Sequence, residues 1–118
     1  MSDKCDCGGA CTFIFPCSGG SDVGELSDRL ARHMGKTGKG KMYCLAGIGG
    51  HVSGIIESTK SASRVIAIDG CPVSCTKKAL EHIGVEGDCF NLKDYGFEKG
   101  KVNVSSVNFD ELIQRMEV

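Results

Sequence analysis

A short apolar run, a glycine-containing turn and a helical segment follow one another three times along this chain. The apolar runs at 12–15, 42–46 and 65–68 suit buried strands. The segment after the first run repeats its apolar residues at about one helical turn. Those residues are Val23, Leu26, Leu30 and Met34. Alternating strands and helices predict right-handed crossovers and a mainly parallel sheet with helices on both faces.

Capping residues indicate where the helices begin and end. Asp22 followed by Glu25 is typical of a capping box at the start of the first helix, and Gly35 is typical of its C-cap. Proline is favoured at the first position of a helix, because its missing N–H would have no partner there. We therefore expect Pro72 to open the third helix, which ends near Gly84.

Further elements are expected after the third unit. A fourth strand is predicted at 90–92, a candidate fifth strand at 102–104, and a final helix that Asn108 and Glu111 would cap. The expected fold is a Rossmann-like, three-layer αβα domain with a mainly parallel sheet of four to five strands.

Length and composition point to one domain. A chain of 118 residues, 41% of them hydrophobic, is near the commonest domain size. We expect a single α/β domain over residues 12–118, preceded at 1–11 by an arm rich in cysteine and glycine that needs a ligand to order it.

Composition also excludes some classes of function. The formal net charge of -1 gives no indication of nucleic-acid binding. The N-terminus has no apolar stretch typical of a secretory signal, and no run approaches the ~18 apolar residues of a membrane helix. Eight cysteines are therefore interpreted as thiols of a cytoplasmic protein, where metal binding or redox chemistry is commoner than structural disulfides. Disulfides are the alternative.

Four of the cysteines are expected to meet at one end of the sheet. Cys17 follows the first strand, Cys44 lies near the end of the second, and Cys71 follows the third. The strand-to-helix loops of a parallel sheet emerge together at its carboxyl end. Cys75 lies about one helical turn after Cys71, so both sulfurs are expected at a helix N-terminus, which favours thiolates. The alternative for Cys44 is a small core residue.

Three motifs carry a family resemblance. The segments 16–20, 44–49 and 68–75 read PCSGG, CLAGIG and IDGCPVSC. They resemble the family described as zinc-binding and named for its Asp-Gly-Cys motif, the DGC domain, from Thr12 to about Phe97. That family consists of small prokaryotic proteins with four potential chelating cysteines. The resemblance implies that these correspond to Cys17, Cys44, Cys71 and Cys75.

The remaining cysteines form a second group. Cys5, Cys7 and Cys11 precede the first strand, and Cys89 lies just before the fourth. Cys11 and Cys89 are thus expected at the amino end of the sheet. We hypothesise that these four cysteines form a second metal site that tethers the arm, the alternative being a disordered arm with free thiols.

Residues close to the motifs have simpler expected roles. Gly70 allows a tight turn or a close backbone approach, and Asp69 is interpreted as a turn-former rather than a base. His51 follows a glycine-rich loop near the expected site and is a candidate extra ligand or proton shuttle, although most such histidines are structural. His33 and His82 fall in last helical turns and are expected at the surface.

The cysteine pattern favours a metal-binding protein, with zinc as the expected metal and a structural, carrier or sensor role. One alternative is a thiol-based redox protein or enzyme, in which Cys17 or Cys71 attacks a substrate or forms a reversible disulfide with Cys75. No arginine follows Cys17 closely enough to suggest phosphoryl binding, so a phosphatase is not expected. Another alternative is electron transfer through an iron–sulfur cluster, because spacing does not distinguish the two metals.

Overall fold

Four parallel strands form the central sheet. The computed structural model describes residues 11–118, so the predicted arm up to residue 10, with Cys5 and Cys7, lies outside the described residues. The strand order across the sheet is β2-β1-β3-β4. The strands are β1 (Thr12–Pro16), β2 (Lys41–Met42), β3 (Arg64–Asp69) and β4 (Asp88–Asn91).

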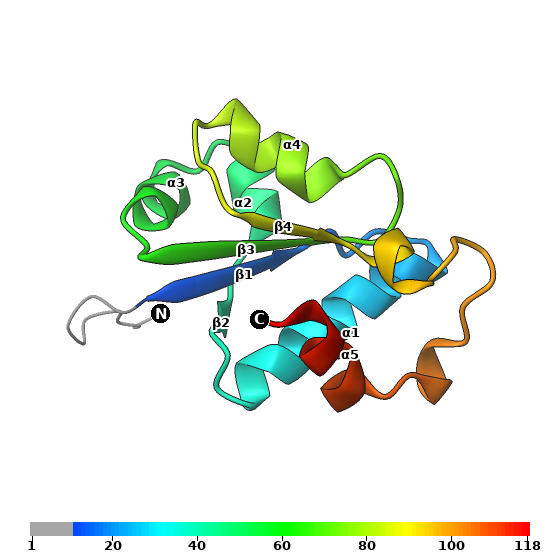
Figure 1. Ribbon diagram of the computed structural model, residues 1–118. Helices are drawn as coiled ribbons and strands as arrows, with labels where there is room; N and C mark the ends of the chain where they lie inside the picture. Colours follow the sequence, from blue (N-terminus) through cyan, green and yellow to red (C-terminus); the bar gives the residue numbers. More distant parts are fainter. Residues whose placement is uncertain (1–10) are drawn as a thin grey trace.

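Helices cover both faces of this sheet, as Figure 1 shows. One face carries α2 (Leu45–Gly49), α3 (Ser53–Lys60) and α4 (Cys75–His82). The other carries α1 (Asp22–Lys36) and α5 (Phe109–Met116). The predicted α/β fold with helices on both faces of a parallel sheet is therefore confirmed, with four strands in the described part of the chain.

Two hydrophobic cores hold the layers together, because successive strand residues point to opposite faces. Ile14 and Ile66 pack with α1 and α5, whereas Phe13, Phe15 and Val65 pack with α2 and α4. Burying a side chain of this size stabilises a fold by roughly 1.5–3 kcal/mol. The two cores fix the sheet, and with it the positions of the loops at its carboxyl end.

The start of α1 differs from the expected capping box. Ser21 is the N-cap, and its hydroxyl accepts the Gly24 N–H at 3.1 Å. Asp22 instead accepts the N–H groups of Gly100 and Val102, each at 2.9 Å, and so ties a distant loop to the helix. The helix also continues through Gly35, and its C-cap is Thr37.

The second strand is shorter than expected. Only Lys41 and Met42 pair with β1, and the apolar residues that follow form α2 rather than a longer strand. The physical reason is that Leu45 and Ile48, three residues apart, turn together onto the face formed by β1 and β3, as one helical turn does. Cys44 thus lies outside the strand, as the N-cap of α2.

The predicted fifth strand is wrong. Val102 gives its N–H to Asp22 rather than to a neighbouring strand, and a short 3₁₀ helix follows at Val104–Ser106. The prediction for the last helix is confirmed, since the Asn108 side chain accepts the Glu111 N–H at 3.0 Å. No helix of residues 11–118 has the length and apolar character needed to cross a membrane.

Candidate functional site

A cavity of about 570 Å³ opens at the carboxyl end of the sheet and contains three of the predicted site cysteines. Cys17 follows β1, Cys44 follows β2, and Cys75 begins α4, and all three line this cavity. Their arrival from three separate connections is what parallel topology predicts. Cys71 does not line the cavity.

Cys17 is the most firmly held of the three. Its backbone N–H donates to the carbonyl of Ile68 at 3.0 Å, which ties the loop to β3. Its half-buried sulfur lies 3.1 Å from the hydroxyl of Ser27. Because Ser27 gives its own hydrogen to the Gly24 carbonyl at 2.8 Å, the thiol of Cys17 is the donor in this contact. The structure therefore presents Cys17 with its sulfur anchored on α1.

Cys44 is exposed, so the interpretation as a core residue is wrong. The preceding residue, Tyr43, provides the anchor: its N–H donates to the Ile14 carbonyl at 2.9 Å. The Tyr43 ring stacks on Phe13 with 4.2 Å between centroids and meets Phe15 edge to face. This aromatic cluster fixes the chain one residue before the thiol.

Cys71 and Cys75 do not share a helical turn, contrary to expectation. The helix begins at Cys75, and Pro72 lies in the loop before it, where Ser74 has a left-handed backbone with φ 59°. The Cys71 carbonyl accepts the side-chain amide of Asn91 at 2.8 Å. The loop also leaves Val73 54% exposed. The loop is therefore fixed at Cys71 by the bond from Asn91, and the side chain of Val73 does not anchor it.

Asp69 explains why α4 begins where it does. Its buried carboxylate accepts the N–H of Thr76 at 2.8 Å and that of Lys77 at 3.1 Å, satisfying the first turn from the end of β3. Gly70 lies against α1, where an added Cβ would overlap the carbonyl of Val23. The Asp-Gly-Cys motif is thus a junction between β3, α1 and α4, and Asp69 accepts hydrogen bonds from a helix start rather than forming the expected turn.

The cavity wall also carries charge that the sequence did not indicate. Asp28 and Arg32 line it, joined by an ion pair of 2.7 Å, and Ser18 donates to Asp28 at 2.8 Å. Burial would raise the pKa of Asp28, but the hydrogen bonds from Arg32 and Ser18 and the charge of Arg32 lower it overall. Arg32 escaped sequence reasoning because only the folded helix brings it to the cavity that holds Cys17. The only available signal was its i, i+4 spacing from Asp28.

No three side chains of His, Cys, Asp or Glu within residues 11–118 are grouped closely enough to hold a metal ion as they stand. A shared ion would therefore require the cavity thiols to approach one another. Cys44 and Cys75 are exposed and can turn, while the sulfur of Cys17 is held by its contact with Ser27.

The second cysteine group is only partly described. Cys11 is buried and disulfide-bonded, so a four-thiolate site that included it would need that bond reduced. Cys89 lies within β4, not before it, beside Ala67 of β3. Desolvation of its thiol raises its pKa, and nearby carboxylates, including that of Asp69, act in the same direction. The second metal site stays a prediction.

The three histidines occupy different surroundings. His33 lies 2.8 Å from a carboxylate oxygen of Asp110 and stacks on Phe109, consistent with a surface helix end. His51 follows α2 with a left-handed backbone, φ 58°. Its ring contacts that of His82, with 5.9 Å between centroids. His51 does not line the cavity that holds the three cysteines.

Comparison with known proteins gives the family. The chain matches the DGC domain over residues 13–116. It is 33% identical to the anaerobic and virulence modulator AnvM of Pseudomonas aeruginosa over 88 residues, which are 74% of this chain and 67% of that protein. No solved structure matches the chain. Since the match covers nearly all of the described domain, this chain belongs to the DGC-domain family.

Proposed function

We propose that this protein binds zinc through the thiolates that line the cavity at the carboxyl end of its sheet. The observation that carries the proposal is that Cys17, Cys44 and Cys75 line one cavity although they come from three separate connections. Thiolate sulfur is the preferred protein ligand of zinc in sites of this kind.

The thiols differ in how freely they can move toward an ion. Cys75 stands at the first position of α4, and its side chain is exposed. Cys44 is exposed beyond its aromatic anchor. The Ser27 hydroxyl beside Cys17 can turn to donate to a thiolate once the thiol proton has left. These three sulfurs form the ligand set that the cavity supports directly.

Cys71 is the candidate fourth ligand. It does not line the cavity, and its backbone carbonyl is held by the side-chain amide of Asn91. Three thiolates and one exchangeable position describe an open site, whereas four protein ligands describe a closed one. None of these four cysteines belongs to the hydrophobic cores. We therefore favour a carrier or sensor role over a structural one, because the hydrophobic cores are built without these thiols.

The name of the relative AnvM supports a sensor role over a structural one. AnvM is called a modulator, and a protein that binds zinc reversibly can report its availability. The proposal for this chain is a metal-responsive protein.

Elemental analysis tests the proposal. Untagged protein purified without oxygen is expected to be colourless and to hold one zinc per chain, and Cys17→Ser, Cys44→Ser or Cys75→Ser should each remove it. Cys71→Ser should weaken binding without abolishing it if the fourth position is exchangeable. Cys89→Ser is the matched control, because this free thiol lies on β4 and outside the cavity. Zinc content that is unaffected by the three cavity substitutions would overturn the proposal, and brown protein with visible absorption would replace zinc by an iron–sulfur cluster.

A second candidate is thiol chemistry at Cys17, which the position of Arg32 in the same cavity wall favours. A guanidinium in the wall of a cavity that holds a nucleophilic sulfur suits an anionic substrate, which would have to compete with Asp28 for Arg32. Inorganic phosphate or sulfate should then slow alkylation of Cys17 while leaving Cys89 unaffected. Equal rates with and without the anion would exclude this candidate.

A further inference from the structure

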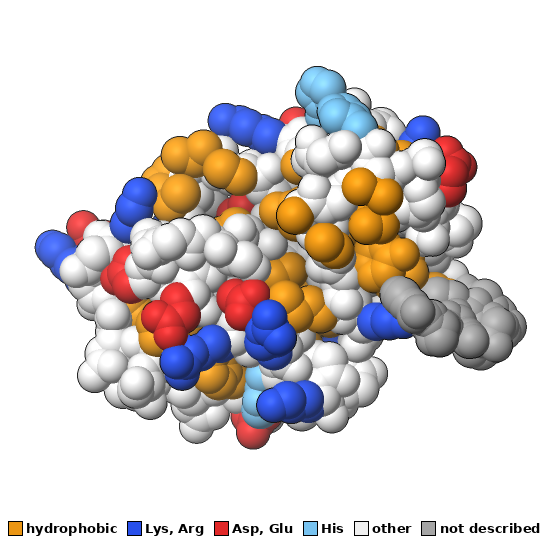
Figure 2. Space-filling view, turned by 180° about the vertical axis from the view of Figure 1, so that it is seen from behind, with side chains coloured by type: hydrophobic (Ala, Val, Ile, Leu, Met, Phe, Trp, Pro, Cys, Tyr) orange, Lys and Arg blue, Asp and Glu red, His pale blue; other side chains and the backbone are white. Residues whose placement is uncertain are grey.

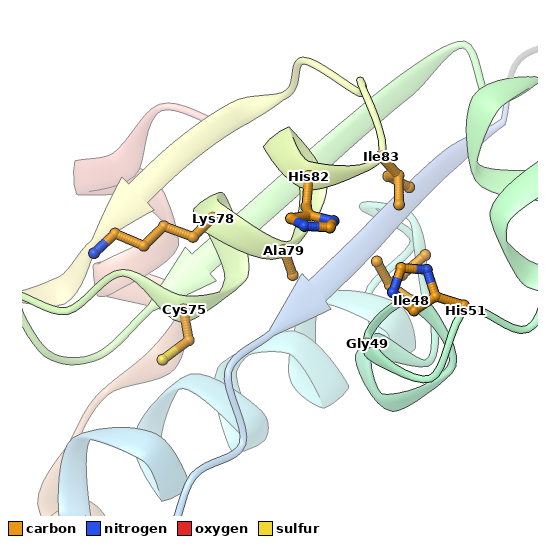
Figure 3. Close-up of a pocket in the computed structure, with 8 residues that line it drawn as sticks. All are labelled: Ile48, Gly49, His51, Cys75, Lys78, Ala79, His82 and Ile83. Atoms are coloured by element: carbon orange, nitrogen blue, oxygen red, sulfur yellow. The ribbon is translucent and has the colours of Figure 1, made fainter.

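A second pocket, of about 410 Å³, lies between α2 and α4 and shares Gly49, Cys75 and Ala79 with the cysteine cavity. Its lining includes His51 after α2 and His82 at the end of α4. Figure 3 shows both imidazoles at the same end of this pocket, with Cys75 at the opposite end. Histidine side chains also gather at one edge of the surface in Figure 2, open to solvent. The zinc proposal uses neither histidine.

The spacing of the two rings suits one shared metal ion. Zinc bonds an imidazole nitrogen at about 2.0–2.1 Å, which places the ring centre about 3.2 Å from the ion. Two rings on one ion therefore have centres no more than about 6.4 Å apart. The centroids of His51 and His82 are 5.9 Å apart. Both side chains are exposed, so small rotations suffice to aim a nitrogen of each ring at a common point.

The surroundings determine what kind of ion the pair would hold. Ile48, Ala79 and Ile83 form an apolar wall, and no carboxylate lines the pocket. Oxygen-seeking ions such as Mg²⁺ and Ca²⁺ are thus disfavoured, whereas imidazole suits Zn²⁺, Ni²⁺ and Cu²⁺. Lys78 also lines the pocket and its charge opposes cation binding. Water would have to complete the coordination, and the resulting site is weak and exchangeable.

We propose that His51 and His82 together bind one divalent transition-metal ion, at a site separate from the cysteine cavity. The two sites adjoin at Cys75, which lines both pockets. This inference does not require the thiol site, since both of its protein ligands are imidazoles.

Paramagnetic Ni²⁺ is a suitable probe, because it broadens the proton signals of the imidazoles that it binds. In NMR spectra of the full chain, substoichiometric Ni²⁺ should broaden the ring signals of His51 and His82. His33, which is paired with Asp110, is the internal control and should stay sharp. Equal broadening of all three imidazoles, or of His33 alone, would overturn the proposal.

Substitutions add a second criterion. In His51→Gln, the broadening of His82 should be lost at the same Ni²⁺ concentration, and His82→Gln should have the same effect on His51. His33→Gln is the matched control and should leave both signals responsive. Broadening of His82 that persists unchanged in His51→Gln would show independent weak binding and disprove a shared ion. Circular dichroism of each variant checks that it is folded.

The two metal proposals can fail separately. A chain carrying Cys17→Ser, Cys44→Ser and Cys75→Ser lacks the thiolates of the cavity but keeps both imidazoles. Ni²⁺ should still broaden His51 and His82 in this chain, even if the wild-type protein holds no zinc. Loss of that response with the three thiols removed would assign the ion to cysteine and overturn the two-histidine site.

Discussion

The carboxylate of Asp69, at the end of β3, accepts the backbone N–H of Thr76 in the first turn of α4 at a distance of 2.8 Å. This bond spans the loop that carries Cys71 and ends at Cys75. Asp69, the first residue of the Asp-Gly-Cys motif, therefore caps α4, the helix that carries the cavity thiol of Cys75.

Replacing Asp69 is expected to destabilise the protein through α4. In Asp69→Asn, the amide oxygen can still accept one N–H, but the NH₂ group faces the second donor, Lys77, which loses its acceptor. Losing a helix cap costs about 0.5–2 kcal/mol, and a buried site belongs at the upper end. Urea denaturation measures the change. A change within error of zero would contradict the capping role.

Gly70→Ala is expected to destabilise the fold, because the new methyl group would overlap the backbone of Val23 in α1. Overpacking of this kind costs about 1–3 kcal/mol. Gly19→Ala is the matched control, since a Cβ at that position meets nothing within 4 Å. Thermal unfolding of the two variants should show a lower Tm for Gly70→Ala only.

Stability should fall in acid partly through Asp22. The hydrogen bond from Gly100, followed by that from Val102, lowers the pKa of this carboxyl below its ordinary value. The charged form is thus favoured in the folded state. Its contribution is fully present above the pKa of the unfolded chain and is lost as the pH falls through the lower pKa of the folded protein.

Asp22→Asn tests that linkage. The variant should be less stable than the wild type near neutral pH, and the difference should shrink as the pH falls through the acid range. Glu25→Gln is the control: Glu25 pairs with Arg29 on the exposed face of α1, where ion pairs contribute little. Urea denaturation across the pH range measures both variants. A difference for Asp22→Asn that is constant with pH would contradict the assignment.

Alkylation of Cys89 is expected to be slow at neutral pH. Desolvation of its thiol raises the pKa; the charge of Lys77 opposes this rise and the charges of Asp69, Glu81 and Asp88 add to it, so less of the reactive thiolate is present. Its rate with iodoacetamide, followed by peptide mass spectrometry, should be below that of free cysteine and should rise steeply above neutral pH. A rate equal to that of free cysteine would show that the raised pKa is not realised.

Removal of metal is expected to leave the fold intact. The hydrophobic cores on the two faces of the sheet contain none of the cavity thiols. Circular dichroism after chelation should therefore retain the helical signal, while added zinc raises Tm by mass action. Unfolding on chelation would instead identify a structural zinc site.

Much of this fold could be predicted because its strands and helices have strong periodicity. The β-branched run of β3 and the apolar stripe of α1 each follow one pattern and occupy one environment. The segment from Met42 to Ala46 misled because a short apolar run fits a strand or a buried helical turn equally. Only tertiary packing placed Leu45 on a helix.

The remaining errors come from partners that are distant in the sequence. Asp22 looked like a helix cap because an aspartate at a helix start usually accepts N–H groups of the same helix. Here it accepts the N–H of Gly100, 78 residues away. Pro72 looked like a helix start because proline is favoured at the first helical position. The helix instead begins at Cys75, and Asp69 accepts the Thr76 N–H from the end of the preceding strand. The arrival of Cys17, Cys44 and Cys75 at one end of the sheet could be predicted, since parallel topology places the strand-to-helix loops together there. The exclusion of Cys71 depended on a loop shape that no pattern encodes.

The aromatic anchor of Tyr43 has a mechanical consequence for the cavity. Its ring is fixed against Phe13 and Phe15 on the sheet, while the next residue, Cys44, is exposed. Because the fixed residue immediately precedes the thiol, the Cys44 side chain can change rotamer without disturbing the pairing of the strands. Under the zinc proposal, the Cys44 sulfur would reach the ion by side-chain rotation, with the cores on both faces of the sheet unchanged.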